Sequence, residues 1–473
     1  RLLVMVEWTI FRTTRRGLQF KPRVALIATR STQVQKLRER LQRNMASKPA
    51  NAKRPKIIAV IGFGGGGHEA TVKGVRDVMT EAGFPPEIIE MPVGFLVETD
   101  DKNPVWALTG CTGEQLYNWG LKQRGLIAFL IMWILTIAQA IALEIDKLCG
   151  LVGQLVGADY GDEAAKVCER VWKEHKPDMV CNFTTGSTEF MVRGLDRANF
   201  AHVPFVAIVS DFEGKGAHSW IEDKRQYTVC GTSICRQQAL DFGLPPNQVF
   251  QTSGMILRPS FYESDEDDAL DFKERLRKIG LDPEKRTCLI FWGGVGSKKV
   301  RDIGLTVSRA NANLNLIFLC GRNAALLEDL KAIEWPCRVC IQGFTQRVSF
   351  YMQMADMIIC KPGPGVCSEA ALLGVPIILE WSCFTLPQEV AVCKWVLNRG
   401  LGLGFTRSSQ LISQVNRMCA MLEAVEENNA VYVQQRPVPI SEKGLTGFDL
   451  SPADNSAVFE VPAIIQDIFD SHV

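Results

Sequence analysis

The residues best suited to chemistry lie between Cys360 and Leu379, where an apolar strand ends in a Gly-Pro-Gly turn. The pattern predicts a helix that begins at Ser368 and a second strand over 376–379. Glycines let a ligand approach the backbone, and the N–H groups at a helix start favour an anion. Glu369 falls in the first turn, where its carboxylate would repel a phosphate but could accept hydrogen bonds from a sugar diol. The stretch therefore predicts a site for the diphosphate and ribose of a nucleotide sugar.

A second glycine motif, at 62–67, follows an apolar run and ends at His68. Its spacing includes G-x-G-x-x-G, and Glu90 ends the next predicted strand, so one interpretation is a nicotinamide-dependent oxidoreductase. The other interpretation centres on His68, which at a helix N-terminus can accept a proton or contact a phosphate. A histidine that merely caps the helix is the structural alternative. The motif alone does not separate these readings.

Further polar and glycine-rich positions follow other predicted strands. Asp211 ends one of them and could orient a base or an acceptor hydroxyl, or could simply cap a turn. In a parallel sheet such positions share one edge, which is where ligands bind. The candidates for donor binding at this edge are Gly293, Gly294, Gly296, Ser297, Arg322, Asn323, Gly343, Phe344, Gln388 and Glu389, beside Lys361, Gly363, Pro364, Gly365, Ser368 and Glu369.

The elements that must position these residues alternate between strand and helix, which predicts parallel, doubly wound sheets. The first series has strands at 57–61, 88–91, 178–182 and 205–210 and helices at 69–82, 162–174 and 191–198; the second has strands at 288–292, 316–319, 339–341, 357–360 and 377–379. We expect a leader over 1–55, a first domain over 56–262, a linker over 263–286, a second domain over 287–425, and a loop with a terminal helix over 426–473. The fold class is therefore α/β, with two Rossmann-like domains facing a cleft.

Charge is distributed unevenly along the 473 residues. Residues 1–56 hold fifteen of the 53 Lys and Arg but only Glu7 and Glu39 among the 52 acidic residues, so the remainder has a net charge of −12. An Arg-rich, acid-poor start is typical of an organelle transit region or a disordered basic arm, with a structural or membrane-surface role as the alternative. We expect no nucleic-acid partner.

The fifteen cysteines do not form a disulfide or zinc pattern. Most lie inside apolar strands or helices, and the pair Cys337 and Cys340 has no second pair at zinc-finger distance. We therefore expect buried free thiols in a reducing compartment and no metal site.

Residues 125–143 form a charge-free apolar run that is long enough to span a membrane. The run lies between strands that must share one sheet, and no second run returns the chain across a bilayer. Contact with one membrane surface is the preferred interpretation, because Trp119, Phe129 and Trp133 suit an interface. A buried helix and a true span are the alternatives.

Taken together, the motifs resemble the monogalactosyldiacylglycerol synthases of glycosyltransferase family 28. The resemblance runs from about residue 56 to 405 and is weaker between 98 and 162. It rests on Gly65-Gly66-Gly67-His68, Ser210-Asp211, His218-Ser219-Trp220, Ser253 to Phe261, Cys320 to Asn323, Gly343-Phe344, Lys361 to Gly365, Ser368-Glu369-Ala370 and Gln388-Glu389.

The resemblance implies a GT-B fold, with a UDP-sugar donor in the C-terminal domain and diacylglycerol in the N-terminal one. It implies that His68 is the catalytic base, that Glu369 binds ribose, and that Gln388 and Glu389 bind the hexose. Gly66 and Gly67 would lie on the acceptor side. It further implies an inverting transfer, most simply of galactose, that needs no metal and no tightly bound cofactor, at an anionic membrane surface of the plastid envelope. Oligomeric state is left open.

Some positions depart from the family pattern. Val366 stands where the family usually has Thr, and Val392 stands where an Asn usually follows the Gln-Glu pair. A UDP-glucose-dependent lipid glucosyltransferase and a non-catalytic nucleotide-sugar-binding protein therefore stay open beside the galactosyltransferase.

Overall fold

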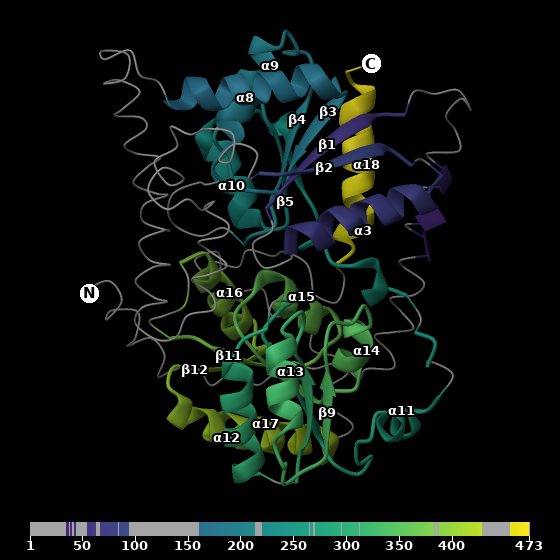
Figure 1. Ribbon diagram of the computed structural model, residues 1–473, viewed down its shortest axis with the longest axis vertical. Coiled ribbons are helices and arrows are strands. Elements are labelled where there is room, and N and C mark those ends of the chain that lie inside the picture. Colours follow the sequence, from purple (N-terminus) through teal and green to yellow (C-terminus); the bar gives the residue numbers. More distant parts are fainter. Residues whose placement is uncertain are drawn as a thin grey trace, which may run out of the picture.

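The chain folds into two α/β domains stacked end to end, as seen in the computed structural model (Figure 1). The structure describes residues 54–62, 67–83, 85–93, 160–212, 220–263, 265–267, 270–294, 296–311, 313–382, 385, 387–427 and 455–472, and parts of 35–43. The 125–143 run and the leader, apart from those parts of 35–43 and residues 54–55, lie outside the described residues.

The N-terminal domain is built on a six-stranded parallel sheet of order β2-β1-β3-β4-β5-β6. Its elements are β1 (Lys56–Ile61), α3 (Gly67–Glu81), β2 (Glu87–Pro92), α8 (Tyr160–His175), β3 (Met179–Asn182), α9 (Thr188–Arg197), β4 (Phe205–Ile208), β5 (Tyr227–Cys230), α10 (Ser233–Phe242), the 3-10 helix η2 (Pro246–Gln248) and β6 (Val249–Gln251).

Both faces of this sheet are covered by helices. Side chains alternate along a strand, so Ile57, Ala59 and Ile61 pack with one set of helices, whereas Ile58 and Val60 pack with the other. The first face is covered by α3 and by the C-terminal helix α18 (Ala457–Asp470), and the second by α8 and α9 (Figure 1). Burial on both faces explains why the strands read as continuous apolar runs.

The C-terminal domain has the order β12-β11-β10-β7-β8-β9, again all parallel. Its elements are β7 (Thr287–Phe291), α12 (Lys299–Ala310), β8 (Asn315–Leu319), α13 (Ala324–Lys331), β9 (Val339–Gln342), α14 (Val348–Gln353), β10 (Met357–Cys360), α15 (Pro364–Leu372), β11 (Ile377–Glu380), α16 (Pro387–Asn398), β12 (Gly402–Phe405) and α17 (Ser408–Glu427). This is the common doubly wound order, and its direction reverses between β7 and β10.

The predicted fold class, two doubly wound domains of the GT-B type, is confirmed by these sheets. The strands β5, β6 and β12 were not predicted; β6 has only three residues, and β12 is half glycine. The prediction that a helix begins at Ser368 is wrong, since α15 begins at Pro364. Proline at the first helical position has no N–H to leave unpaired and its φ suits a helix, so it extends the helix start into the turn.

The domains are joined by the segment that runs from β6 through the 3-10 helix η3 (Pro259–Phe261) and α11 (Phe272–Lys278). Phe212 meets Trp395 edge to face across the interface, with ring centroids 5.2 Å apart. The C-terminal segment returns to the N-terminal domain, where the Ser253 N–H donates to Glu460 at 3.0 Å. The C-terminal helix α18 therefore stabilises the start of the connection between the domains.

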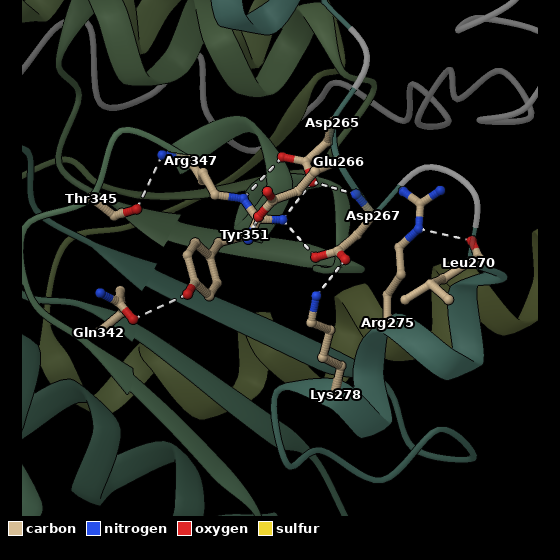
Figure 2. A network of polar contacts seen from close by, with 10 residues as sticks. All are labelled: Asp265, Glu266, Asp267, Leu270, Arg275, Lys278, Gln342, Thr345, Arg347 and Tyr351. Atoms are coloured by element: carbon tan, nitrogen blue, oxygen red, sulfur yellow. Dashed lines mark hydrogen bonds and ion pairs between the residues drawn. The ribbon is translucent and has the colours of Figure 1, made fainter.

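The acidic residues of this connection are bound to the C-terminal domain, as Figure 2 shows. Arg347 donates to Asp265 through Nε at 3.1 Å and to Asp267 through Nη2 at 2.6 Å. Lys278 also bonds Asp267, which is only 4% exposed. The Lys278 ammonium and then the Arg347 guanidinium hold the pKa of Asp267 below its ordinary value. One arginine thus anchors the connection at two points.

Of the twelve cysteines that the structure describes, all are free thiols and nine are buried. Within the described ranges, no helix has both the length and the apolar character needed to cross a membrane.

Candidate active site at the domain interface

In the N-terminal domain, the strand order reverses between β1 and β3, which creates a crevice at their carboxyl ends. His68 lies in the first turn of α3, just after the glycine loop that follows β1. Its Nδ1 bonds the Phe183 carbonyl, which follows β3. A carbonyl can only accept, so Nδ1 must carry the proton and Nε2 keeps its lone pair. His68 therefore has the tautomer required of a base that acts through Nε2.

Two more side chains of this domain contact or face His68. Trp220 stacks on its ring, with the centroids 6.2 Å apart and the planes 12° from parallel. The indole Nε1 of Trp220 in turn donates to Asp211 at 3.3 Å. Burial raises the pKa of Asp211, an effect that the nearby His68 opposes. These three residues, from separate segments, form one group.

In the C-terminal domain the corresponding reversal lies between β7 and β10, and both strands end in glycine-containing loops. Gly321, after β8, packs directly against the loop after β7: a Cβ on Gly321 would meet the Gly294 carbonyl oxygen at 2.2 Å, and φ is +58°. A Cβ on Gly296, with φ of +68°, would meet the Cys320 oxygen at 2.4 Å. These glycines are required by the packing of the two loops against each other as well as by any ligand.

The start of α15 is the clearest anion-binding feature of this domain. Gly363 caps the helix and Pro364 is its first residue. A Cβ on Gly365 would meet nothing within 4 Å, so the space beside this turn is open. Unpaired N–H groups at a helix start, with the positive end of the helix dipole, favour an anion such as a phosphate.

Lys361 and Glu389 connect the two halves of the site. Lys361 Nζ lies 2.8 Å from Glu389 Oε1. Both residues also interact electrostatically with Asp211 of the other domain, Glu389 raising the pKa of Asp211 and Lys361 lowering it, although burial is the largest influence. The predicted donor residues Lys361 and Glu389 therefore face the predicted catalytic group.

Glu369 lies deeper than its predicted place in the first helical turn. It is 6% exposed, and its Oε1 accepts hydrogen bonds from Arg258 at 2.6 and 3.1 Å. Burial raises the pKa of Glu369, and the Arg258 guanidinium opposes that rise. The neighbouring Ser368 hydroxyl is buried and has no hydrogen-bond partner within the described ranges. A buried hydroxyl without a partner can bind a polar ligand group.

Other predicted donor residues lie along the same edge with mixed roles. Arg322 packs over the ring of Phe344 at 5.1 Å and lies 3.5 Å from Glu69 of the N-terminal domain. Phe344 is 53% exposed, which leaves one ring face open for stacking. Asn323 instead caps α13, accepting from the Leu326 N–H at 2.9 Å. Ser297 and Gly343 follow β7 and β9, respectively.

Some predicted residues are not described. Gly66, Trp119, Phe129 and Trp133 lie outside the described residues, as do His218 and Ser219. Gly67 is placed as the first residue of α3 and Gln388 within α16, by backbone only. Val392 is fully buried in the C-terminal core, so its departure from the family pattern does not place an apolar group in the site.

Sequence reasoning missed three functional candidates: Arg258, Trp220 and Glu222. Arg258 and Trp220 lay within stretches that carry the family resemblance but were given no role of their own. No sequence pattern indicated Glu222. Burial raises the pKa of Glu222 to about 7, although backbone N–H groups of Thr188 and Glu189 lower it. Contacts between distant segments distinguish these residues, and such contacts leave no local signal.

The dinucleotide interpretation required an acidic residue at the end of the second strand, and the structure does not place one there. Glu90 lies within β2 rather than at its end, and it pairs with Arg76 of α3.

Among the residues that the structure places, no group of three His, Cys, Asp or Glu side chains could hold a metal ion.

The chain matches no protein-family model. It is 30% identical over 223 residues to probable monogalactosyldiacylglycerol synthase 2 of Oryza sativa subsp. indica, covering 46% of each chain. It is 25% identical over 371 residues to monogalactosyldiacylglycerol synthase 3 of Arabidopsis thaliana, covering 76% of this chain and 73% of that one. The chain spans about half the length of the first of these relatives.

Solved structures give a more distant likeness. MurG of Acinetobacter baumannii is 14% identical with a TM-score of 0.45, over 87% of this chain and 100% of that one. A UDP-GlcNAc 2-epimerase of Neisseria meningitidis is 13% identical with a TM-score of 0.48, over 88% and 99%. These scores are too low to indicate what this chain binds. The chain is therefore similar in sequence to proteins named monogalactosyldiacylglycerol synthases, over about half of it at 30% identity and over about three quarters at 25%.

Proposed function

We propose that the protein transfers a hexose, most simply galactose, from a UDP-sugar to diacylglycerol with inversion at the anomeric carbon. The observation that supports this most directly is that a possible base and a possible anion-binding site face each other at the interface between the domains. His68, Trp220 and Asp211 come from one domain, and Lys361, Glu389 and the start of α15 come from the other. A transferase needs both a base and a site for a charged leaving group, and each domain supplies one of them.

On the acceptor side, His68 Nε2 would take the proton of the lipid hydroxyl as that oxygen attacks the anomeric carbon. The Phe183 carbonyl holds the tautomer, and the imidazolium that forms would be stabilised by the Asp211 carboxylate. Because the attacking oxygen approaches opposite the leaving group, the product has inverted configuration.

On the donor side, the bond between the anomeric carbon and the UDP oxygen breaks, and UDP leaves with the electron pair. The N–H groups at the start of α15 and the Lys361 ammonium would stabilise the growing negative charge. Glu369 would accept hydrogen bonds from the ribose, with Ser368 beside it; Gln388 and Glu389 would bind the hexose. The loops at Gly293–Ser297 and Gly321–Asn323 would line the diphosphate, and Phe344 the base.

The relatives are named as chloroplastic, and we extend this to the present chain: a plastid protein bound to one face of the envelope. The basic leader and the apolar 125–143 run support contact with anionic lipid. That no metal takes part remains a prediction.

Three alternatives are distinguished by a transfer assay together with binding measurements for UDP and NAD(P). The purified protein would be given diacylglycerol in mixed anionic lipid with labelled UDP-galactose or UDP-glucose in parallel. A labelled monogalactosyl lipid is the expected product; a glucosyl lipid would identify the other donor. UDP binding without product from either sugar would favour a non-catalytic member. Binding of NAD(P) in place of UDP would favour the oxidoreductase interpretation.

A further inference from the structure

His68 is held between two chain segments that are distant in sequence. One segment is the loop after β3, whose Phe183 carbonyl bonds Nδ1. The other contains Trp220, which stacks on the imidazole. The orientation of Nε2 therefore depends on how these two segments are fixed relative to each other.

The Trp220 segment is rigid by itself. The Gln226 side chain, which is fully buried, donates to the Trp220 carbonyl at 2.9 Å and to the Thr228 hydroxyl at 2.9 Å. Its oxygen accepts from the N–H groups of Glu222 and Asp223 at 2.9 and 3.1 Å. One amide thus bonds three backbone groups of the 220–223 turn and ties it to the start of β5.

The loop after β3 is fixed at both ends. At its start, the Phe183 N–H donates to the Val60 carbonyl at 2.8 Å. At its end, where α9 begins, the Ser187 side chain makes no cap hydrogen bond, and its buried hydroxyl has no partner among the residues that the structure describes. Glu222 takes over the capping role: its Oε2 accepts from the N–H groups of Thr188 at 2.7 Å and Glu189 at 3.4 Å. The helix N-terminus is therefore capped by the rigid turn rather than by its own N-cap residue.

We propose that Glu222 is a positioning residue for His68, because it alone among the described side chains bonds the end of the Phe183 loop to the Trp220 turn. Its importance for turnover depends on the proposed transferase activity; its effect on the His68 ring does not. Within the described part of the chain, the hydrogen bonds of Glu222 join it to the start of α9 and to the Gln226 amide and not to His68, so it acts through the two segments. A carboxylate suits this task, since it accepts two N–H groups and complements the positive end of α9.

The test compares Glu222→Ala with the control Glu189→Ala, which removes a carboxylate from the first turn of the same helix without disturbing the turn. In the transfer assay we expect kcat to fall about tenfold for Glu222→Ala, with the donor KM and the UDP affinity within about twofold of wild type. Glu222→Gln keeps a carbonyl oxygen for the Thr188 N–H and should recover most of the lost kcat. Equal losses in Glu222→Ala and Glu189→Ala, or no recovery in Glu222→Gln, would overturn the proposal.

A second readout does not require activity. The chain has only five histidines, so the ¹⁵N imidazole resonances of His68 can be assigned by their loss in His68→Ala. These resonances should move in Glu222→Ala, reflecting a mixed tautomer, and stay in place in Glu189→Ala and Glu222→Gln. Unmoved resonances in Glu222→Ala would overturn the proposal. If the wild-type protein transfers no hexose, the proposed function fails, and the resonances alone decide whether Glu222 positions His68.

Discussion

In the N-terminal domain, the strand next to the reversal of order ends in a glycine loop and His68; in the C-terminal domain, the equivalent strands end in glycine loops and the start of α15. Both sheets are six-stranded, parallel and doubly wound, with the reversal placed one strand differently, yet the groups presented at the two crevices differ more. The first crevice contains two titratable side chains, His68 and Asp211, with Trp220 in contact with both. The second presents backbone N–H groups and one ammonium, from Lys361.

A doubly wound sheet thus determines where a site lies, whereas the residues placed there decide the chemistry. Proton transfer needs titratable side chains with a fixed tautomer. Binding a diphosphate needs donors that are already oriented and do not titrate. Mutations in the first crevice should therefore lower kcat, whereas mutations in the second should weaken UDP affinity.

The largest effect is expected from His68→Ala. Loss of the base should lower kcat by about a hundredfold or more, while UDP affinity, which belongs to the other crevice, stays the same. Turnover and UDP binding by calorimetry would be measured together. His202→Ala serves as control, because His202 precedes β4 at the opposite edge of the sheet. Undiminished turnover would remove His68 from the mechanism.

A smaller effect, on binding, is expected from Glu369→Ala. Loss of the ribose acceptor should weaken UDP affinity by about tenfold, corresponding to one or two hydrogen bonds to a charged group. The control Glu328→Ala removes a surface carboxylate of the same domain that pairs with Lys331 at 3.1 Å. Since Glu369 also binds Arg258, melting temperatures must be compared. An unaltered UDP affinity would count against the ribose assignment.

Asp211→Asn should lower kcat by roughly tenfold near neutral pH, because an amide cannot stabilise the imidazolium by charge. Burial raises the pKa of Asp211, so the wild-type carboxylate protonates at a higher pH than an ordinary aspartate. As the pH falls through that range, the wild type loses its advantage and the ratio of the two rates should approach one. A ratio that is constant with pH would show that the charge of Asp211 is not used.

The last effect is on stability rather than rate. Burial raises the pKa of Glu222 to about 7 from its ordinary 4.5. Between these values the unfolded chain has lost the proton that the folded chain still holds, so rising pH destabilises the folded state, by roughly 3 kcal/mol at most. Glu222→Gln removes this titration. The melting temperature of the variant relative to wild type should therefore rise from pH 4.5 to pH 7 and then level off; a constant difference would contradict the raised pKa.

Much of the fold could be predicted because it depends on local patterns. Apolar runs of four to six residues between glycine turns located β1, β3, β7, β8, β10 and β11, whose side chains are buried on both faces. β5, β6 and β12 were missed; β6 has only three residues, and β12 is half glycine, so neither gives a distinct apolar run. The start of α15 was misplaced because a turn-like Pro-Gly sequence also suits the first turn of a helix.

The sequence by itself determined the two-domain α/β class, the sheet edge that carries the candidate site, and His68, Lys361 and Glu369 as candidates, because each lies close to a glycine turn at the end of a strand. Only the tertiary structure decided what these residues contact. Arg258 reaches Glu369 from 111 positions away, and Trp220 and Phe183 enclose His68 from distant segments. Glu222 joins two segments 34 residues apart. Such contacts depend on how packed elements meet in space, and no local periodicity or spacing records them.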